Sequence, residues 1–216
     1  LGGNGMLGSQ LVEDRKSLND VYTIGRTKCI NSKKHFEIDI NNAQSLSLFL
    51  KENYFELVIN SAAIIDHVEC EKNPEDCLRI NALINKTLLD STHYETKIIY
   101  ISTDAVFSDK NKERLPGSCT SPQSLYGLSK DFAEKILLNS EELRNFLIIR
   151  TTIVGFNFKK KGFIEWIVNS LLNNKEITIF EDVIFNPISI YNLSAKIKYI
   201  LNREQIKRNI IHLNGT

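Results

Sequence analysis

Short apolar runs alternate with helical stretches along most of this chain, and this alternation constrains the fold more than any other feature. The runs at 21–24, 35–38, 57–60, 97–102 and 146–150 have the composition of buried parallel strands. Helical patterns cover 6–15, 43–53, 74–91 and 125–139. Such alternation predicts an α/β fold with a doubly wound parallel sheet and right-handed crossovers.

Small and polar residues come directly after these strands. In chain order they are Gly25-Arg26, Asp39-Ile40, Ser61-Ala62-Ala63, Ser102-Thr103-Asp104 and Thr151-Thr152-Ile153. The carboxyl ends of parallel strands meet at one edge of a sheet, where ligands of this fold class bind. We therefore expect these residues to line one site, because a random scatter of polar residues would not sort in this way.

A glycine-rich turn opens the chain, with Gly2, Gly5 and Gly8 ahead of the first helix. In this G-x-x-G-x-x-G spacing the glycines permit a tight turn, close backbone approach to a pyrophosphate and close packing of helix on strand. The free N–H groups of the helix then face the phosphates. An ordinary glycine turn is the alternative for the motif alone. Because a strand should precede such a turn, we expect that the chain has lost residues before Leu1.

Tyr126 and Lys130 lie one turn apart on the same face of the 125–139 helix. A separate, core-facing stripe is expected from Leu125, Leu128, Phe132 and Ile136. A neighbouring ammonium lowers the pKa of a phenol from its usual value of about 10, so the phenol can exchange a proton with a ketone or an alcohol. Thr103 supplies a hydroxyl for the same oxygen. For the pair alone, the alternative is a surface Tyr-x-x-x-Lys without a catalytic role. Together with the glycine turn, the pair predicts an oxidoreductase with a nicotinamide cofactor.

Composition excludes several other classes of protein. Hydrophobic residues make up 42% and charged residues 25% of the 216 residues, the balance of a soluble globular protein, and the net charge of +1 attracts neither nucleic acid nor an anionic membrane. The chain has no apolar run of membrane-spanning length and no visible signal peptide. Cys29, Cys70, Cys77 and Cys119 form neither C-x-x-C nor a metal-binding spacing. They are interpreted as reduced thiols of a cytoplasmic protein without a metal.

Several segments resemble the extended short-chain dehydrogenases/reductases, and within that superfamily the RmlD-like dTDP-4-dehydrorhamnose reductase group. The matching segments are 2–11, 39–41, 58–81, 100–108, 124–130 and 148–155. Of these, S-T-D-x-V-F and Y-G-x-S-K are together the most specific for the group. The resemblance covers nearly the whole chain and fades after Gly155.

The resemblance implies a catalytic set of Thr103, Tyr126 and Lys130, in which Lys130 also holds the nicotinamide ribose. Thr103 and Asp104 would contact the sugar. With the glycine turn and Arg26, the expected cofactor-binding residues are Gly2, Gly5, Met6, Leu7, Gly8, Arg26, Asp39, Ile40, Ala62, Ala63, Ile64, Tyr126, Lys130 and Ile153. Asn81 is interpreted as a structural polar residue and left out of the site.

Arg26 bears on the choice of cofactor. An NAD enzyme of this type often has a carboxylate after the second strand, but this chain has Gly25-Arg26-Thr27-Lys28 there. A guanidinium suits a 2′-phosphate. NADP(H) is therefore the preferred cofactor, with NAD(H) as the second choice and a solvated basic loop as the alternative reading.

The predicted domains are a Rossmann domain at 1–155 and part of a sugar-nucleotide-binding lobe at 156–216. In the second range we expect helices at 162–173 and 190–201 and strands at 177–180 and 210–213. The family lobe continues past the point where this chain stops, so truncation after Thr216 is expected too.

The resemblance implies NADPH-dependent reduction of the 4-keto group of a nucleotide-activated deoxysugar, for deoxysugar or surface-polysaccharide synthesis. Two alternatives stay open: a UDP-acetamido-sugar reductase or epimerase, and a non-catalytic regulatory subunit that binds NADP(H). Loss of the catalytic trio would favour the subunit, and the trio is complete. A homodimer is left open, and the sequence does not choose the sugar or the nucleotide base.

Overall fold

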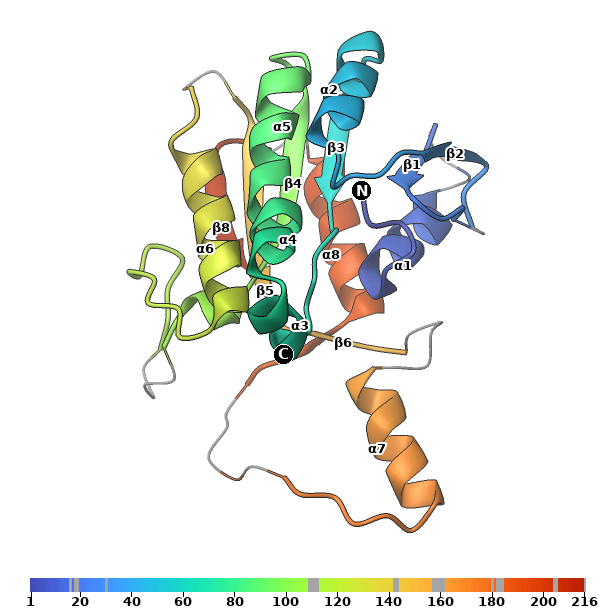
Figure 1. Cartoon of the computed structure of the whole chain (residues 1–216), viewed down its shortest axis with the longest axis vertical. Helices are drawn as coiled ribbons and strands as arrows, with labels where there is room; N and C mark the ends of the chain where they lie inside the picture. The colour runs from blue at the N-terminus through green and yellow to red at the C-terminus, as the bar shows by residue number, and fades with distance from the viewer. Residues whose placement is uncertain are drawn as a thin grey trace.

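A four-stranded parallel sheet forms the centre of the molecule (Figure 1). The computed structural model describes residues 1–15, 17, 20–29, 31–108, 113–141, 144–156, 162–179, 181, 185–203 and 206–215. The strand order is β3-β4-β5-β8, with β3 at Leu57–Asn60, β4 at Lys97–Thr103, β5 at Phe146–Thr151 and β8 at Asn209–His212. In register, Ile99 pairs with Leu147 and Thr103 with Thr151, so β4 and β5 end side by side.

Helices cover both faces of this sheet, as the alternation of strands and helices predicts. α2 (Ala43–Glu52), α5 (Ile84–Ser91) and α6 (Leu125–Leu138) pack on one face, together with Tyr100 and Ile148. α1 (Met6–Arg15) and α8 (Ile190–Asn202) pack on the other face, together with Ile99 and Ile149. Because successive strand residues point to opposite faces, these apolar strands supply both cores. The doubly wound α/β fold is therefore confirmed.

Two further strand pairs lie outside the central sheet. β1 (Tyr22–Gly25) pairs with β2 (Lys34–Glu37), and β6 (Ile153–Val154) pairs with β7 (Ile188–Ser189). The strands expected to form one sheet are thus divided between two, and the sequence did not predict the pair of β6 and β7. β1 begins and ends one residue later than predicted, and β2 begins and ends one residue earlier. β4 and β5 are each one residue longer than predicted.

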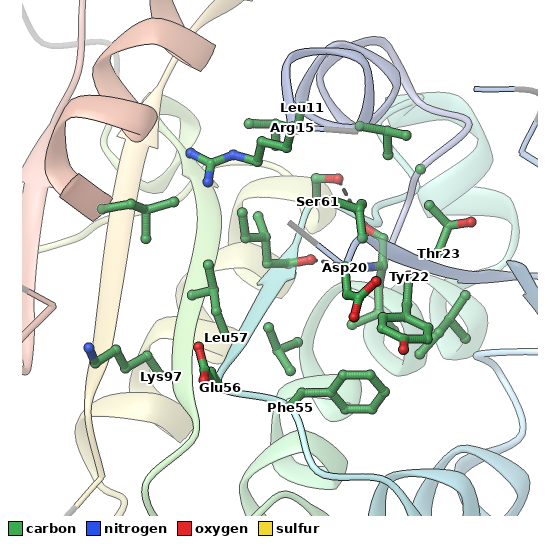
Figure 2. A pocket seen from close by; sticks show the side chains of 18 of the residues that line it. Leu11, Arg15, Asp20, Tyr22, Thr23, Phe55, Glu56, Leu57, Ser61 and Lys97 are labelled. Carbon is green, nitrogen blue, oxygen red and sulfur yellow. Dashed lines mark hydrogen bonds between the residues drawn. The ribbon is translucent and has the colours of Figure 1, made fainter. Parts of the chain in front are cut away.

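A cavity of about 1030 Å³ separates β1 from β3. Figure 2 shows Arg15, Tyr22, Phe55 and Leu57 around it. Leu1 lies at this cavity, where its amino group donates to the carbonyl oxygen of Ile59 at 2.8 Å and its own carbonyl accepts from the amide of Ser61 at 3.2 Å. The cavity thus lies beside β3 and the glycine turn, ahead of which the sequence predicts a strand. The existence of such a strand stays a prediction.

The predicted helix at 74–91 is divided into three segments. α4 (Pro74–Leu78) passes into a π-helical segment, η1 (Arg79–Leu83), and then into α5. α3 (His67–Lys72) precedes them and a short 3₁₀ helix, η2 (Asp104–Val106), follows β4. π-Helical turns are often found at functional sites.

The C-terminal range contributes to the central body as well. α7 (Phe163–Leu172) lies apart from the sheet in Figure 1, but α8 packs on the sheet and β8 completes it. The predicted strand at 177–180 is wrong for residues 177–179, which are irregular, and Phe180 is outside the described residues. The division into domains at residue 155 stays a prediction. Within the described part of the chain, no helix is long and apolar enough to cross a membrane.

Candidate active site

The glycine turn is packed so closely that two of its glycines have no room for a side chain. Gly2 has a φ of +82°, and a Cβ there would lie 2.7 Å from the amide nitrogen of Ala62. A Cβ on Gly8 would overlap the carbonyl oxygen of Gly2. Gly5 differs, because a Cβ there would meet only the carbonyl oxygen of Gly2, at 3.1 Å. The turn is thus held from within by Gly2 and Gly8, while a Cβ on Gly5 would have a single tight contact.

This turn fits a dinucleotide pyrophosphate. α1 begins at Met6, directly after Gly5, and the first N–H groups of a helix have no partner within it. They attract an anion together with the helix dipole. The side chain of Leu7 is buried in the core, so Leu7 can contribute only its backbone to such a ligand.

The loop after β1 is tied to the glycine turn. The side-chain amide of Asn4 donates to the carbonyl oxygen of Thr27 at 2.7 Å. The thiol of Cys29 donates to the carbonyl oxygen of Gly3 at 3.3 Å. Arg26 is exposed on this loop. The tertiary structure therefore attaches the loop that carries the guanidinium to the turn that would hold the phosphates.

The segment after β3 passes alongside the turn and is fixed by Asn81. Ala62 is buried and Ala63 and Ile64 are half-buried. The side-chain oxygen of Asn81 accepts from the amide of Ile64 at 2.7 Å, and its side-chain nitrogen donates to the carbonyl of Ile64 at 2.9 Å and to Ser129 Oγ at 2.9 Å. Asn81 is structural, as interpreted, but it also links the 62–64 segment to α6. Asn81 lies in the π-helical segment η1, and such segments are often found at functional sites. Sequence reasoning missed the linking role because a π-helical turn is not visible in a sequence.

The start of α6 is seated against the end of β4. Ser124 caps the helix by accepting from the amide of Gly127 at 3.1 Å. A Cβ on Gly127 would overlap the carbonyl oxygen of Ala105, so glycine permits this approach. Tyr126 is thereby brought to Thr103, whose hydroxyl lowers the pKa of the phenol; the same hydroxyl donates to Asp104 Oδ1 and accepts from the amide of Ala105, both at 3.2 Å. The strand and the helix that carry the predicted catalytic residues thus meet at this point.

Lys130 is buried beneath this contact. Its ammonium donates to the carbonyl oxygen of Ile101 at 2.7 Å and lies 4.2 Å from the ring centroid of Tyr100. Burial lowers the pKa of Lys130 from 10.5 to about 7, because the charged form loses hydration, and the carboxylate of Glu134 opposes this only in part.

The expected lowering of the Tyr126 pKa is wrong for the protein as described. Burial raises the pKa of Tyr126 to about 12, and the hydroxyl of Thr103 opposes this only in part. Lys130 directs its ammonium to Ile101 instead of the phenol. The phenol is therefore protonated at neutral pH, which suits a proton donor.

The predicted core-facing stripe of α6 is also wrong in part. Leu128 and Phe132 are 49% and 44% exposed, whereas Lys130 is 2% exposed. Polar residues occupy the buried face because they have partners there: Glu134 pairs with Arg150 at 2.6 Å and accepts from the hydroxyl of Ser102 at 2.5 Å. Hydrophobic periodicity does not reveal such buried pairs, since it counts polar side chains as exposed.

The remaining predicted site residues lie at the ends of strands. Asp39 follows β2, is exposed, and accepts from the amide of Asn41 at 3.0 Å, while Ile40 packs against the core. Asp104 is exposed directly after β4. Ile153 is half-buried in β6 and follows the end of β5. None of these placements by itself tests binding, and the binding roles stay predictions.

Comparison with known proteins identifies the family of the chain. The family described as "RmlD substrate binding domain" matches residues 1–216. The chain is 27% identical over 144 residues to the spore coat polysaccharide biosynthesis protein SpsK of Bacillus subtilis, covering 66% of this chain and 50% of that protein. It is 26% identical over 203 residues to the probable low-salt glycan biosynthesis reductase Agl14 of Haloferax volcanii, covering 90% and 67%. The chain thus spans half the length of SpsK.

Solved structures show the same fold. A hypothetical dTDP-4-dehydrorhamnose reductase from Sulfolobus tokodaii superposes with a TM-score of 0.88 at 26% identity, covering 100% of this chain and 75% of that one. A dTDP-4-dehydrorhamnose reductase from Bacillus anthracis, solved in complex with NADP, superposes with a TM-score of 0.78 at 24% identity, covering 100% and 73%. At this identity the second likeness shows the fold alone.

Proposed function

Because the chain belongs to the RmlD substrate binding domain family of extended short-chain dehydrogenases/reductases, we propose that it reduces the 4-keto group of a nucleotide-activated deoxysugar with NADPH. The observation that carries this proposal is the approach of Tyr126 to Thr103 at the end of β4, next to the strand residue Ile101 that accepts from the ammonium of Lys130. Family membership alone covers reductases and epimerases, and the specific reaction rests on this trio.

Each residue of the trio has a separate role. Tyr126 donates its phenolic proton to the keto oxygen of the sugar, and the hydroxyl of Thr103 orients the phenol. Lys130 positions α6 through the carbonyl of Ile101 and has further N–H donors for a ribose. When bound, the nicotinamide supplies the hydride.

The chain also has the parts of a dinucleotide site. Gly5 and the start of α1 would hold the pyrophosphate, and the 62–64 segment held by Asn81 would line the inner pocket. Arg26, on the loop tied to Asn4, would pair with a 2′-phosphate and so favour NADPH over NADH.

The proposal is tested by following NADPH oxidation with a panel of dTDP-, UDP- and GDP-linked 4-keto sugars. A 4-keto deoxysugar should be reduced, and its product should carry a hydroxyl at carbon 4. Tight NADP(H) binding with no turnover of any sugar would instead identify a regulatory subunit. Interconversion of UDP-sugar epimers without net NADPH oxidation would identify an epimerase.

A further inference from the structure

Cys70 and Cys77 bring their sulfur atoms together next to the candidate active site. Cys70 lies in α3 and Cys77 in α4, and their Sγ atoms are 2.7 Å apart. Non-bonded heavy atoms usually pack at about 3.5–4.0 Å, whereas a disulfide joins its sulfurs at about 2.05 Å. A small movement would therefore bring this pair of free thiols to bonding distance.

The other cysteines have different surroundings. The thiol of Cys29 donates to the carbonyl oxygen of Gly3, and Cys119 is exposed. Among the four cysteines, all of which lie in the described part of the chain, Cys70 and Cys77 are the two whose sulfurs are in contact. The structure thus singles out one pairing, which the sequence did not.

We propose that Cys70 and Cys77 are a modification site at which a reversible disulfide forms between these two residues. The oxidant is a low-molecular-weight disulfide such as oxidised glutathione. One cysteine thiolate attacks the glutathione disulfide, breaks its S–S bond and releases one glutathione thiolate. The other cysteine thiolate then attacks the mixed disulfide at the protein sulfur and releases the second glutathione. Two cysteine thiols are oxidised, one glutathione disulfide is reduced to two thiols, and two protons pass to glutathione.

The short helix α3 controls access to this site. Cys70 is the buried residue of α3, and the other residues of this helix are exposed. Both sulfurs are inaccessible in the closed protein, and burial raises the pKa of the Cys70 thiol to about 12. Exchange proceeds through the thiolate, so the first attack requires α3 to open. Oxidation should therefore be slow at neutral pH and faster in more alkaline solution.

The pair also contacts the network behind the site. Cys77 donates to Ser129 Oγ at 3.5 Å and accepts from Asn81 Nδ2 at 3.4 Å, and Cys70 donates to the carbonyl oxygen of Ile64 at 3.6 Å. Forming the bond removes the thiol protons that make two of these contacts. The modification would therefore act on the segments that carry Ile64 and Tyr126.

The test is to treat the protein with oxidised glutathione, block the remaining thiols with iodoacetamide and measure the intact mass. The expected product has lost two hydrogens. Trypsin cleaves after Lys72, between the two cysteines, so peptides 52–72 and 73–79 should remain joined until dithiothreitol separates them. This readout requires no enzymatic activity and is independent of the proposed function.

Matched variants separate this pair from the other cysteines. The double variant Cys29→Ala/Cys119→Ala should lose two hydrogens as the wild type does, whereas Cys70→Ala and Cys77→Ala should not. The double variant keeps the test valid even if a buried alanine prevents folding. After prolonged alkaline treatment, four alkylated cysteines in the wild type and two in the double variant, or glutathione adducts alone in both proteins, would overturn the proposal.

Discussion

The ammonium of Lys130 donates a hydrogen bond of 2.7 Å to the carbonyl oxygen of Ile101. Ile101 lies in the strand that ends at Thr103, and Lys130 lies one helical turn after Tyr126. This bond therefore holds the helix that carries the phenol against the strand that carries the hydroxyl. It also explains how a lysine on α6 can be buried, because its charged group has a partner there.

Replacement of Tyr126 by phenylalanine should remove the proton donor and keep the shape of the side chain. We expect turnover of the best 4-keto sugar to fall by about 10²–10⁴, the range for loss of a positioned general acid. The dissociation constant of NADPH, measured by fluorescence titration, should change little. Reduction by the variant at the wild-type rate would contradict the assigned role.

Replacement of Lys130 by methionine should weaken cofactor binding and turnover together. The ammonium would hold the ribose and also positions α6 through Ile101, so its loss affects both steps. The control is Lys135→Met on the same helix, whose ammonium pairs with Asp131 and is largely exposed. Steady-state kinetics and NADPH titration should separate the two variants. Equal behaviour of both would exclude a special role for Lys130.

The pKa of Lys130 should make the free energy of unfolding depend on pH. Burial lowers this pKa from 10.5 to about 7, so between these values the unfolded chain binds a proton that the folded protein has released. Stability should therefore rise from about pH 7 to about pH 10, with no contribution to the slope below pH 7.

Urea unfolding of wild type and Lys130→Met across this range measures the effect. The difference in free energy should shift in favour of the wild type by roughly 1 kcal/mol per pH unit. Groups present in both proteins, including Tyr126 and Cys70, largely cancel in this comparison. A difference that does not change with pH would mean that Lys130 keeps an ordinary pKa.

Loss of the Arg26 guanidinium should weaken NADPH selectively. With Arg26→Ala we expect the binding free energy of NADPH to fall by about 1–3 kcal/mol, and that of NADH to stay unchanged, because only NADPH has the 2′-phosphate. Lys33→Ala, which removes an exposed charge close by in the sequence, serves as the control for general electrostatics. If wild type binds both cofactors equally and Arg26→Ala changes neither, the assignment of Arg26 is wrong.

A methyl group on Gly127 should separate α6 from the end of β4. The new Cβ of Gly127→Ala would overlap the carbonyl oxygen of Ala105, a backbone atom, and such overpacking costs about 1–3 kcal/mol. We expect a lower melting temperature and reduced turnover. Gly117→Ala is the matched control, because no atom lies within 4 Å of a Cβ there. Similar melting temperatures for the two variants would show that the contact with Ala105 is not restrictive.

Much of the fold was predictable because it depends on local patterns. The strand at Leu57–Asn60 has the predicted bounds, and the ends of α1 and α6 agree with the prediction to within one residue. Apolar runs of this length and the helical spacing between them reflect local propensity and burial. The irregular conformation of 177–179 was not predictable in this way, because a short apolar run forms a strand only when a neighbouring strand pairs with it.

The sequence by itself determined the alternation of strands and helices, the glycine turn, and the order of Thr103, Tyr126 and Lys130 along the chain. These features follow from residue type and spacing. Only the tertiary structure decided that Lys130 is buried while Leu128 is exposed, and that Cys70 meets Cys77. The physical reason is that burial, pKa and side-chain contacts depend on groups from distant parts of the chain, such as Ile101 for Lys130 and Asn81 for Ile64.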